Sequence, residues 1–199
     1  TIVFFSVAAA EDELLADLVS GDVTLTVTHP AELETLTRVS GRAGRSADVH
    51  VKVDTGMHRS GVMAAEAGEL IAAVRAADNV ELTGLYTHFA SADEADKSFT
   101  LGQQQAFERV VAEVGGEGLL LHAANSAALL DLPQTHLGMV RPGIAIYGYQ
   151  PSDETSNRPT LRPAMRLRAK LAQVKQVPAG GFTGYGRTYR FDRDSRIGL

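Results

Sequence analysis

Residues 49–62 read VHVKVDTGMHRSGV, and this stretch decides the fold because it begins as a strand and ends as a loop. As far as position 54 apolar and polar residues alternate strictly. A period of two places the valines on one face and His50, Lys52 and Asp54 on the other. A Thr-Gly pair then breaks the strand, so Arg59 follows the strand's C-terminal end. The stretch therefore predicts a strand with one apolar face and one face of reactive side chains.

Two environments fit such an alternating strand. In a surface antiparallel sheet the charged side would face water. In a parallel sheet covered by helices, Lys52 and Asp54 would instead point into a barrel or cleft. The neighbouring segments decide between the two, because repeated alternation of strands and helices indicates a parallel sheet.

Strand and helix patterns alternate through most of the chain. Strands are expected at 2–7, 23–28, 49–54, 82–88 and 119–122, with a sixth beginning at 139–141. Helices are expected at 10–19, 30–39, 64–77, 101–114 and 126–130. These six βα units fit either a doubly wound open sheet or part of a (β/α)8 barrel.

The positions of the polar residues favour the barrel. They fall at or just past the C-terminal ends of different strands: Asp54 and Arg59, His88, Asn125 and Ser126, and Arg141. In a barrel those ends converge on one active site. An open sheet would gather ligand contacts at one switch point, and no G-x-G-x-x-G follows any strand. The sequence predicts an α/β fold with a partial (β/α)8 TIM barrel.

Composition changes after residue 149, which predicts a domain boundary. Residues 150–161, QPSDETSNRPTL, are polar and aperiodic, so we expect a linker between a partial barrel at 1–149 and a second domain at 162–199. The second domain opens with an alternating run, 165–177, followed by a Pro-Ala-Gly-Gly turn. This pattern is typical of the start of a C-terminal β domain.

Composition also limits the possible functions. The 199 residues are 44% hydrophobic and 22% charged, as in an ordinary globular protein. The net charge of -5, without a basic cluster, argues against a nucleic-acid partner. The absence of cysteine excludes disulfides and is compatible with the cytoplasm. Since no apolar run reaches the roughly 18 residues that span a bilayer, we expect a soluble protein with no membrane partner. The abrupt ends suggest an internal fragment.

Five strings, in this order and spacing, closely resemble alanine racemase: KVDTGMHRSG, LYTHFASAD, HAANSAALL, MVRPGIAIYG and GYGRTY. The resemblance implies a fold type III enzyme that uses pyridoxal 5'-phosphate to interconvert L- and D-alanine by a two-base mechanism. It further implies a bacterial, cytoplasmic homodimer that supplies D-alanine for peptidoglycan. The family's N-terminal Schiff-base lysine motif and most of its C-terminal domain have no counterpart here. We therefore expect these residues alone to be inactive.

The resemblance assigns the cofactor-binding residues, which are His88, His122, Asn125, Ser126, Arg141, Gly143 and Ile144. Arg141 resembles the arginine that meets the pyridine nitrogen and disfavours transamination. His122 would orient this arginine, and His88 would lie beside the cofactor ring. The other four would bind the phosphate, after strands seven and eight of the family's barrel. An Asn-Ser pair is also an ordinary helix cap, and a lone strand histidine is often a core residue.

Three further residues are assigned to catalysis by the same resemblance. Lys52 matches a position that is carbamylated in many members, where the resulting anion can hold Arg59 in place. Arg59 would bind the substrate carboxylate and hydrogen-bond Tyr185. Tyr185 resembles the catalytic tyrosine that the partner subunit contributes, whereas Tyr189 is expected to be a structural strand residue.

Two other functions stay open on chemical grounds. A metal-dependent TIM-barrel hydrolase could use His50, Asp54, His88 and His122 as ligands beside a modified Lys52. A non-catalytic pyridoxal-phosphate-binding homologue would keep the cofactor site without turnover. The sequence also leaves open whether alanine is preferred to serine or another small amino acid.

Overall fold

The computed structural model describes residues 1–7 and 10–199, and the chain divides into two compact units, Thr1–Ala164 and Met165–Leu199. The stretch 150–161, expected to be a linker, lies in the first unit. Its backbone amides at Ser156 and Asn157 donate to the Asp131 carboxylate at 2.9 and 2.7 Å. The boundary at residues 150–161 that the sequence suggests therefore stays a prediction.

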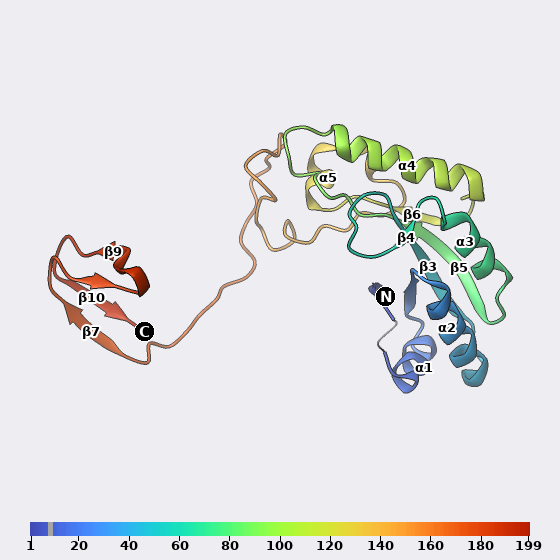
Figure 1. Ribbon diagram of the computed structural model, residues 1–199, viewed down its shortest axis with the longest axis horizontal. Helices are drawn as coiled ribbons and strands as arrows, with labels where there is room; N and C mark the ends of the chain where they lie inside the picture. The colour runs from blue at the N-terminus through green and yellow to red at the C-terminus, as the bar shows by residue number, and fades with distance from the viewer. Residues whose placement is uncertain (8–9) are drawn as a thin grey trace. The chain divides into compact units, whose positions relative to one another are not determined.

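The first unit is built on a parallel sheet whose strands follow chain order (Figure 1). The order is β1-β2-β3-β5-β6, with the bounds Ile2–Ser6, Thr24–Val27, Ala47–Asp54, Val80–Tyr86 and Leu120–His122. A doubly wound sheet reverses its strand order at the switch point, and this sheet does not. The partial barrel is thus confirmed, and the open-sheet alternative is wrong.

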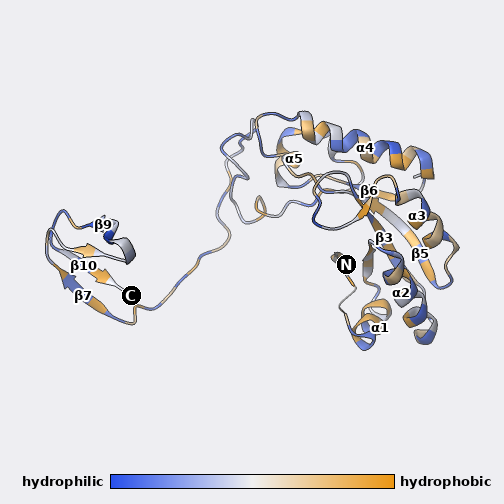
Figure 2. Cartoon of the chain, viewed as in Figure 1, coloured by the Kyte–Doolittle hydropathy of each residue, from blue (hydrophilic) through white to orange (hydrophobic). Residues whose placement is uncertain are grey.

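The helices of the first unit alternate with these strands and are amphipathic, with hydrophobic and hydrophilic residues interspersed along each (Figure 2). They are α1 (Asp12–Ser20), α2 (Pro30–Ala43), α3 (Ala67–Ala76), α4 (Ser98–Val114) and α5 (Ser126–Asp131). The ends of α2 follow from its sequence. The His29 side chain accepts a hydrogen bond from the Ala31 amide, Pro30 occupies the first turn, and Gly44 ends the helix at φ 65°.

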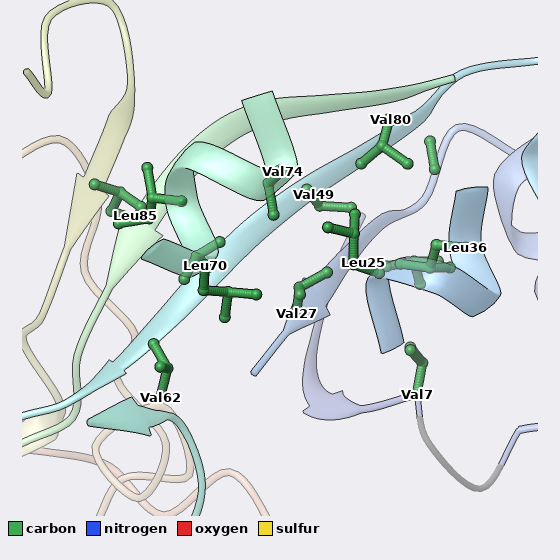
Figure 3. Close-up of a cluster of buried hydrophobic side chains, with 14 of the residues drawn as sticks. Val7, Leu25, Val27, Leu36, Val49, Val62, Leu70, Val74, Val80 and Leu85 are labelled. Atoms are coloured by element: carbon green, nitrogen blue, oxygen red, sulfur yellow. The ribbon is translucent and has the colours of Figure 1, made fainter. Parts of the chain in front are cut away.

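The hydrophobic core lies between the sheet and its helices. Val49, Val51 and Val53 of β3 are fully buried, and in Figure 3 side chains of α3 such as Leu70 and Val74 lie in the same cluster as Val49. Each such side chain contributes about 1.5–3 kcal/mol by leaving water. The apolar face of β3 is therefore the core face.

The polar face of β3 is buried as well. His50, Lys52 and Asp54 are only 2%, 3% and 6% exposed, so the surface-strand interpretation is wrong. Parallel register places His50 beside Gly84, and Lys52 beside Tyr86. The reactive face of β3 thus faces the barrel interior, where the pleats of neighbouring strands line up.

Some local expectations are not met. The short strand β4 (Val62–Met63) was not predicted, and it pairs in parallel with the end of β3. Instead of a sixth strand, only an isolated bridge joins Met139 to His122. The reason is backbone hydrogen bonding: the Arg141 amide donates to the Ala124 carbonyl, and Pro142, having no N–H, cannot continue a ladder.

The second unit contains two short antiparallel pairs. Strand β7 (Val174–Val177) pairs with β10 (Ser195–Gly198), and β8 (Phe182–Thr183) pairs with β9 (Tyr189–Arg190). The 3-10 helix η2 (Tyr185–Arg187) lies between β8 and β9. Only the end of the alternating run 165–177 is a strand, because β10 pairs with it no further than Val174.

None of the helices in the described ranges is long and apolar enough to cross a bilayer.

Candidate functional site

An open pocket of about 300 Å³ lies at the C-terminal ends of the sheet strands. Its lining is His88, Asp93, Asn125, Ser126, Ala127, Arg141, Gly143, Ile144 and Pro151. All but one of the residues that the sequence assigns to a cofactor are among them. The exception, His122, is fully buried and is hydrogen-bonded to Arg141. The structure thus brings the predicted cofactor-binding residues together.

Arg141 is the best-fixed side chain of the pocket. One terminal nitrogen, Nη1, donates to His122 Nδ1 at 2.5 Å. The other, Nη2, donates to the backbone carbonyls of Thr87 and Ala123 at 2.6 and 3.2 Å and lies 3.3 Å from His88 Nδ1. Burial lowers the pKa of Arg141 to about 10, while Tyr86 acts to raise it. The guanidinium therefore stays charged at neutral pH and is held in one orientation.

Two histidines of the site are neutral. Burial first, and then the charge of Arg141, lower the pKa of His88 to about 4. The same two causes, together with His50, lower the pKa of His122 to about 2. A neutral imidazole offers one lone pair, which is what a donor-only guanidinium requires. Both rings can therefore face Arg141 without charge repulsion.

Tyr86 forms an aromatic platform under the cations of the site. Its ring stacks on His122 with centroids 4.7 Å apart and an interplanar angle of 13°. The Arg141 guanidinium carbon lies 5.0 Å from the Tyr86 centroid, and Lys52 Nζ lies 5.9 Å from it. The sequence reasoning missed Tyr86. The period of two could have found it, since Tyr86 and His88 lie two residues apart in the strand expected at 82–88.

Asn125 and Ser126 do act at a helix start. Asn125 Oδ1 caps α5 by accepting from the Ala128 amide at 3.0 Å. Ser126 Oγ accepts from the amides of Gly143 at 2.9 Å and Ala145 at 3.2 Å. A hydroxyl has two lone pairs and one proton, so both Ser126 lone pairs are used and its proton remains to be donated. The Ser126 hydroxyl lines the pocket as a donor.

Lys52 and Arg59 both lie in the stretch 49–62, Lys52 on β3 and Arg59 on the loop that follows it, and they differ in exposure. Lys52 is buried, and its Nζ donates to Ser60 Oγ at 2.6 Å. Burial and then the charge of Arg59 lower the pKa of Lys52, against the opposite effect of Asp54. Arg59 is exposed on the loop. The two cations are thus near enough to interact, and Lys52 is biased toward its neutral amine.

Tyr185 lies in the second unit, at the start of η2, with a fully exposed side chain. The predicted hydrogen bond from Arg59 to Tyr185 would join residues of different units and stays a prediction. Tyr189 lies on β9 and packs edge-on against Phe191 with centroids 5.1 Å apart. That packing agrees with a structural role for Tyr189.

The residues proposed as metal ligands use their donor atoms elsewhere. His50 Nδ1 and His122 Nε2 face each other at 2.8 Å. Asp54 Oδ1 accepts from the amides of Gly56 and His58 at 2.9 and 3.1 Å. Across the described ranges no three His, Cys, Asp or Glu residues are grouped as a metal site requires. This geometry does not favour the hydrolase interpretation.

A parallel half-barrel with a polar pocket at the carboxyl ends of its strands defines a class, the TIM-barrel proteins that bind a small ligand at that face. Comparison with known proteins identifies the group within the class. Residues 1–151 match the family described as "Alanine racemase, N-terminal domain", and residues 164–199 match "Alanine racemase, C-terminal domain". The chain belongs to the alanine racemase family.

Individual relatives agree with this assignment. The chain is 44% identical over 185 residues to an alanine racemase of Desulfovibrio desulfuricans, covering 92% of this chain and 50% of the relative. It is 38% identical over 192 residues to one of Methanococcus maripaludis, covering 94% of this chain and 51% of the relative. The chain spans about half the length of the curated relatives it matches.

Solved structures give the same result. An alanine racemase from D-cycloserine-producing Streptomyces lavendulae is 36% identical with a TM-score of 0.80, over 99% of this chain and 52% of that one. An alanine racemase of Clostridium difficile 630 is 34% identical with a TM-score of 0.79, over 95% of this chain and 50% of that one. The fold of each unit is therefore that of the corresponding part of such proteins.

Proposed function

We propose that the complete protein containing this chain is an alanine racemase that interconverts L- and D-alanine with pyridoxal 5'-phosphate. The observation that carries the proposal is the pocket of about 300 Å³ in which Arg141 and the Ser126 hydroxyl present donors to the same space. Relatives solved with cycloserine and with L-Ala-P support a small amino-acid substrate.

The residues of the pocket fit pyridoxal phosphate. The Ser126 proton is free to be donated to a phosphate oxygen, and open space surrounds Gly143, where an added Cβ would meet no atom within 4 Å. Arg141 supplies a fixed donor for an acceptor such as a ring nitrogen. Bound there, the cofactor would supply an electron sink for the bond between Cα and hydrogen.

Arg141 determines how strong that sink is. A guanidinium that remains protonated can only donate, so the ring nitrogen would stay unprotonated. His122 Nδ1 and the Thr87 carbonyl fix the direction in which Arg141 donates. We propose that His88 lies beside the cofactor ring, and that Asn125 and Ile144 complete the phosphate end of the pocket. Racemisation would then be favoured over transamination.

Three residues would handle the substrate. Arg59 binds its carboxylate, and Tyr185 of the partner subunit exchanges the proton on one face of Cα. Lys52, buried and with a lowered pKa, is suited to react with carbon dioxide as the neutral amine, and its carbamate would then hold Arg59. A carbonyl resonance from ¹³C-labelled bicarbonate, lost in Lys52→Arg, would identify this modification.

The location, oligomeric state and domain division of the complete protein follow from the same proposal. We infer a cytoplasmic homodimer with active sites shared between subunits, supplying D-alanine for peptidoglycan. We further propose that residues 1–149 belong to the cofactor-binding barrel and that residues 162–199 begin the C-terminal β domain. The two family matches, at 1–151 and 164–199, support this division.

The test compares two tyrosine variants of the complete protein in deuterated water. Tyr185→Phe should keep cofactor binding, followed by visible absorbance, but one alanine enantiomer should then acquire solvent deuterium at Cα much faster than the other. Tyr189→Phe, the matched control in the same unit, should behave as the wild type.

The outcomes separate the competing functions. Equal deuterium incorporation into both enantiomers by Tyr185→Phe would overturn its assignment as a base. Cofactor binding without any racemisation by the wild type would favour the non-catalytic homologue. A stoichiometric divalent metal without bound cofactor would favour the hydrolase. The 199 residues alone should bind the cofactor weakly and racemise nothing.

A further inference from the structure

His50 is a buried imidazole that the proposed reaction does not use. It lies on the interior face of β3, only 2% exposed, with its ring 4.9 Å from the ring of His122. Its Nδ1 lies 2.8 Å from His122 Nε2. His122 in turn accepts from Arg141 at Nδ1, so three side chains form one chain of hydrogen bonds.

The direction of every hydrogen bond in this chain follows from Arg141. Arginine has no acceptor, so His122 Nδ1 must carry the lone pair. A neutral His122 then has its proton on Nε2 and donates it toward His50. His50 must accept at Nδ1 and carry its own proton on Nε2. Arg141 therefore fixes the tautomers of both histidines.

We propose that His50 is a positioning residue for Arg141, acting as the acceptor that holds His122 in the orientation Arg141 needs. The relevance to catalysis rests on the proposed function, whereas the hydrogen-bond chain itself does not.

The physical reason is the cost of an unpaired donor. Without His50, the Nε2 proton of His122 would be buried with no acceptor from this side chain. Stacking on Tyr86 holds the plane of the His122 ring, but a change in the His122 χ1 angle can still shift the ring along that plane. Any such shift moves Nδ1 away from Arg141. Since hydrogen-bonded chains polarise one another, His50 also strengthens the bond between His122 and Arg141.

Asparagine and leucine at position 50 provide a matched pair, because they have nearly the same shape and differ in polarity. In His50→Asn, Oδ1 stands close to where Nδ1 was and can still accept from His122. In His50→Leu no acceptor remains. Thermal unfolding of both variants establishes that each is folded before they are compared. A role in packing alone would affect the two variants alike.

The measurement is nuclear magnetic resonance of the complete protein with ¹⁵N-labelled histidine and arginine, without cofactor or substrate. In the wild type we expect His122 and His50 as Nε2–H tautomers, with scalar coupling between His122 Nε2 and His50 Nδ1. His50→Leu should speed hydrogen exchange at the Arg141 Nη groups by about tenfold, and His122 should become a mixture of its two neutral tautomers. His50→Asn should stay near the wild type.

Two results would overturn the proposal. One is a wild-type His122 protonated at Nδ1. The other is a His50→Leu variant whose Arg141 exchange and His122 tautomer match those of His50→Asn. Because neither measurement involves cofactor or alanine, failure here is distinguishable from failure of the racemase assignment, which the deuterium experiment addresses.

Discussion

At position 84 the neighbouring strands leave no room for a side chain larger than that of glycine. A Cβ at this position would lie 2.5 Å from His50 Nε2 and 2.6 Å from the Leu120 carbonyl oxygen. The carbonyl belongs to the paired strand β6 and cannot move without disturbing the ladder. Gly84→Ala should therefore lower the free energy of unfolding by about 1–3 kcal/mol, measured by urea denaturation.

Gly102 provides the control for that substitution. It lies inside α4, and an added Cβ there would meet no atom within 4 Å. Gly102→Ala should raise the free energy of unfolding by about 0.5–1 kcal/mol, because alanine has less conformational entropy to lose in a helix. If the two alanines have the same effect, crowding by His50 and Leu120 is not what limits position 84.

A substitution of the single residue Arg141 tests the reaction specificity of the proposed enzyme. In Arg141→Glu the new carboxylate would share a proton with the ring nitrogen of the cofactor, so the fraction of transamination relative to racemisation should rise. Arg109→Glu, the same charge change at an exposed position of α4, should leave the product ratio unchanged. An unchanged ratio in Arg141→Glu would mean that Arg141 does not face the ring. The Thr87 carbonyl loses its donor in this variant, so folding is checked alongside.

Among the elements, α3 and α4 are joined by an arginine clamp. Arg75 of α3 donates from Nη1 to the Val114 carbonyl at 2.5 Å and from Nη2 to the Gly115 carbonyl at 2.7 Å. These acceptors are the free carbonyls at the end of α4, where a cation is favourable. Arg75→Met keeps the apolar stem and should cost about 0.5–1.5 kcal/mol in urea denaturation. Arg109→Met should lower the free energy of unfolding by less. An equal decrease in the two variants would show that the hydrogen bonds of Arg75 do not stabilise the contact between α3 and α4.

Predictability differs among elements for physical reasons. The strand β3 and the helices α2 and α4 could be located from periodicity and end signals, because their own sequences determine them. Strand β4 could not, since its two residues form a strand only by pairing with β3. The pocket residues were found through the motifs. The period of two could also have placed Tyr86 on the interior face, but its contact with His122 depends on which strands are neighbours. Likewise, the capping role of Asn125 was predictable, and the two amide contacts of Ser126 were not.

The stability of the whole molecule should depend on three histidines, of which His50 and His122 are buried and His88 is partly buried. The pKa values of His50 and His88 are lowered to about 4 and that of His122 to about 2, chiefly by burial. An unfolded histidine has a pKa near 6.5, so below that pH the unfolded state binds protons that the folded state excludes. Their contribution is complete above about pH 6.5 and is lost as the pH falls, toward about 4 for His50 and His88 and toward about 2 for His122.

Urea denaturation at a series of pH values measures this dependence. The free energy of unfolding should fall by up to about 1.4 kcal/mol per pH unit for each of these histidines between roughly pH 6 and 5. His50→Asn removes one of them and should reduce the slope by roughly a third. A flat profile over this interval would show that the three imidazoles accept protons in the folded state.

The close approach of His50 to Gly84 also limits which residues can occupy these two positions in homologous proteins. An imidazole at position 50 leaves no room for a side chain at position 84, since the Cβ would lie 2.5 Å from its Nε2. Homologous sequences should therefore covary at these positions: members with histidine at 50 keep glycine at 84, and members with larger residues at 84 have a smaller residue at 50. The two sites then evolve as a pair although they lie on different strands.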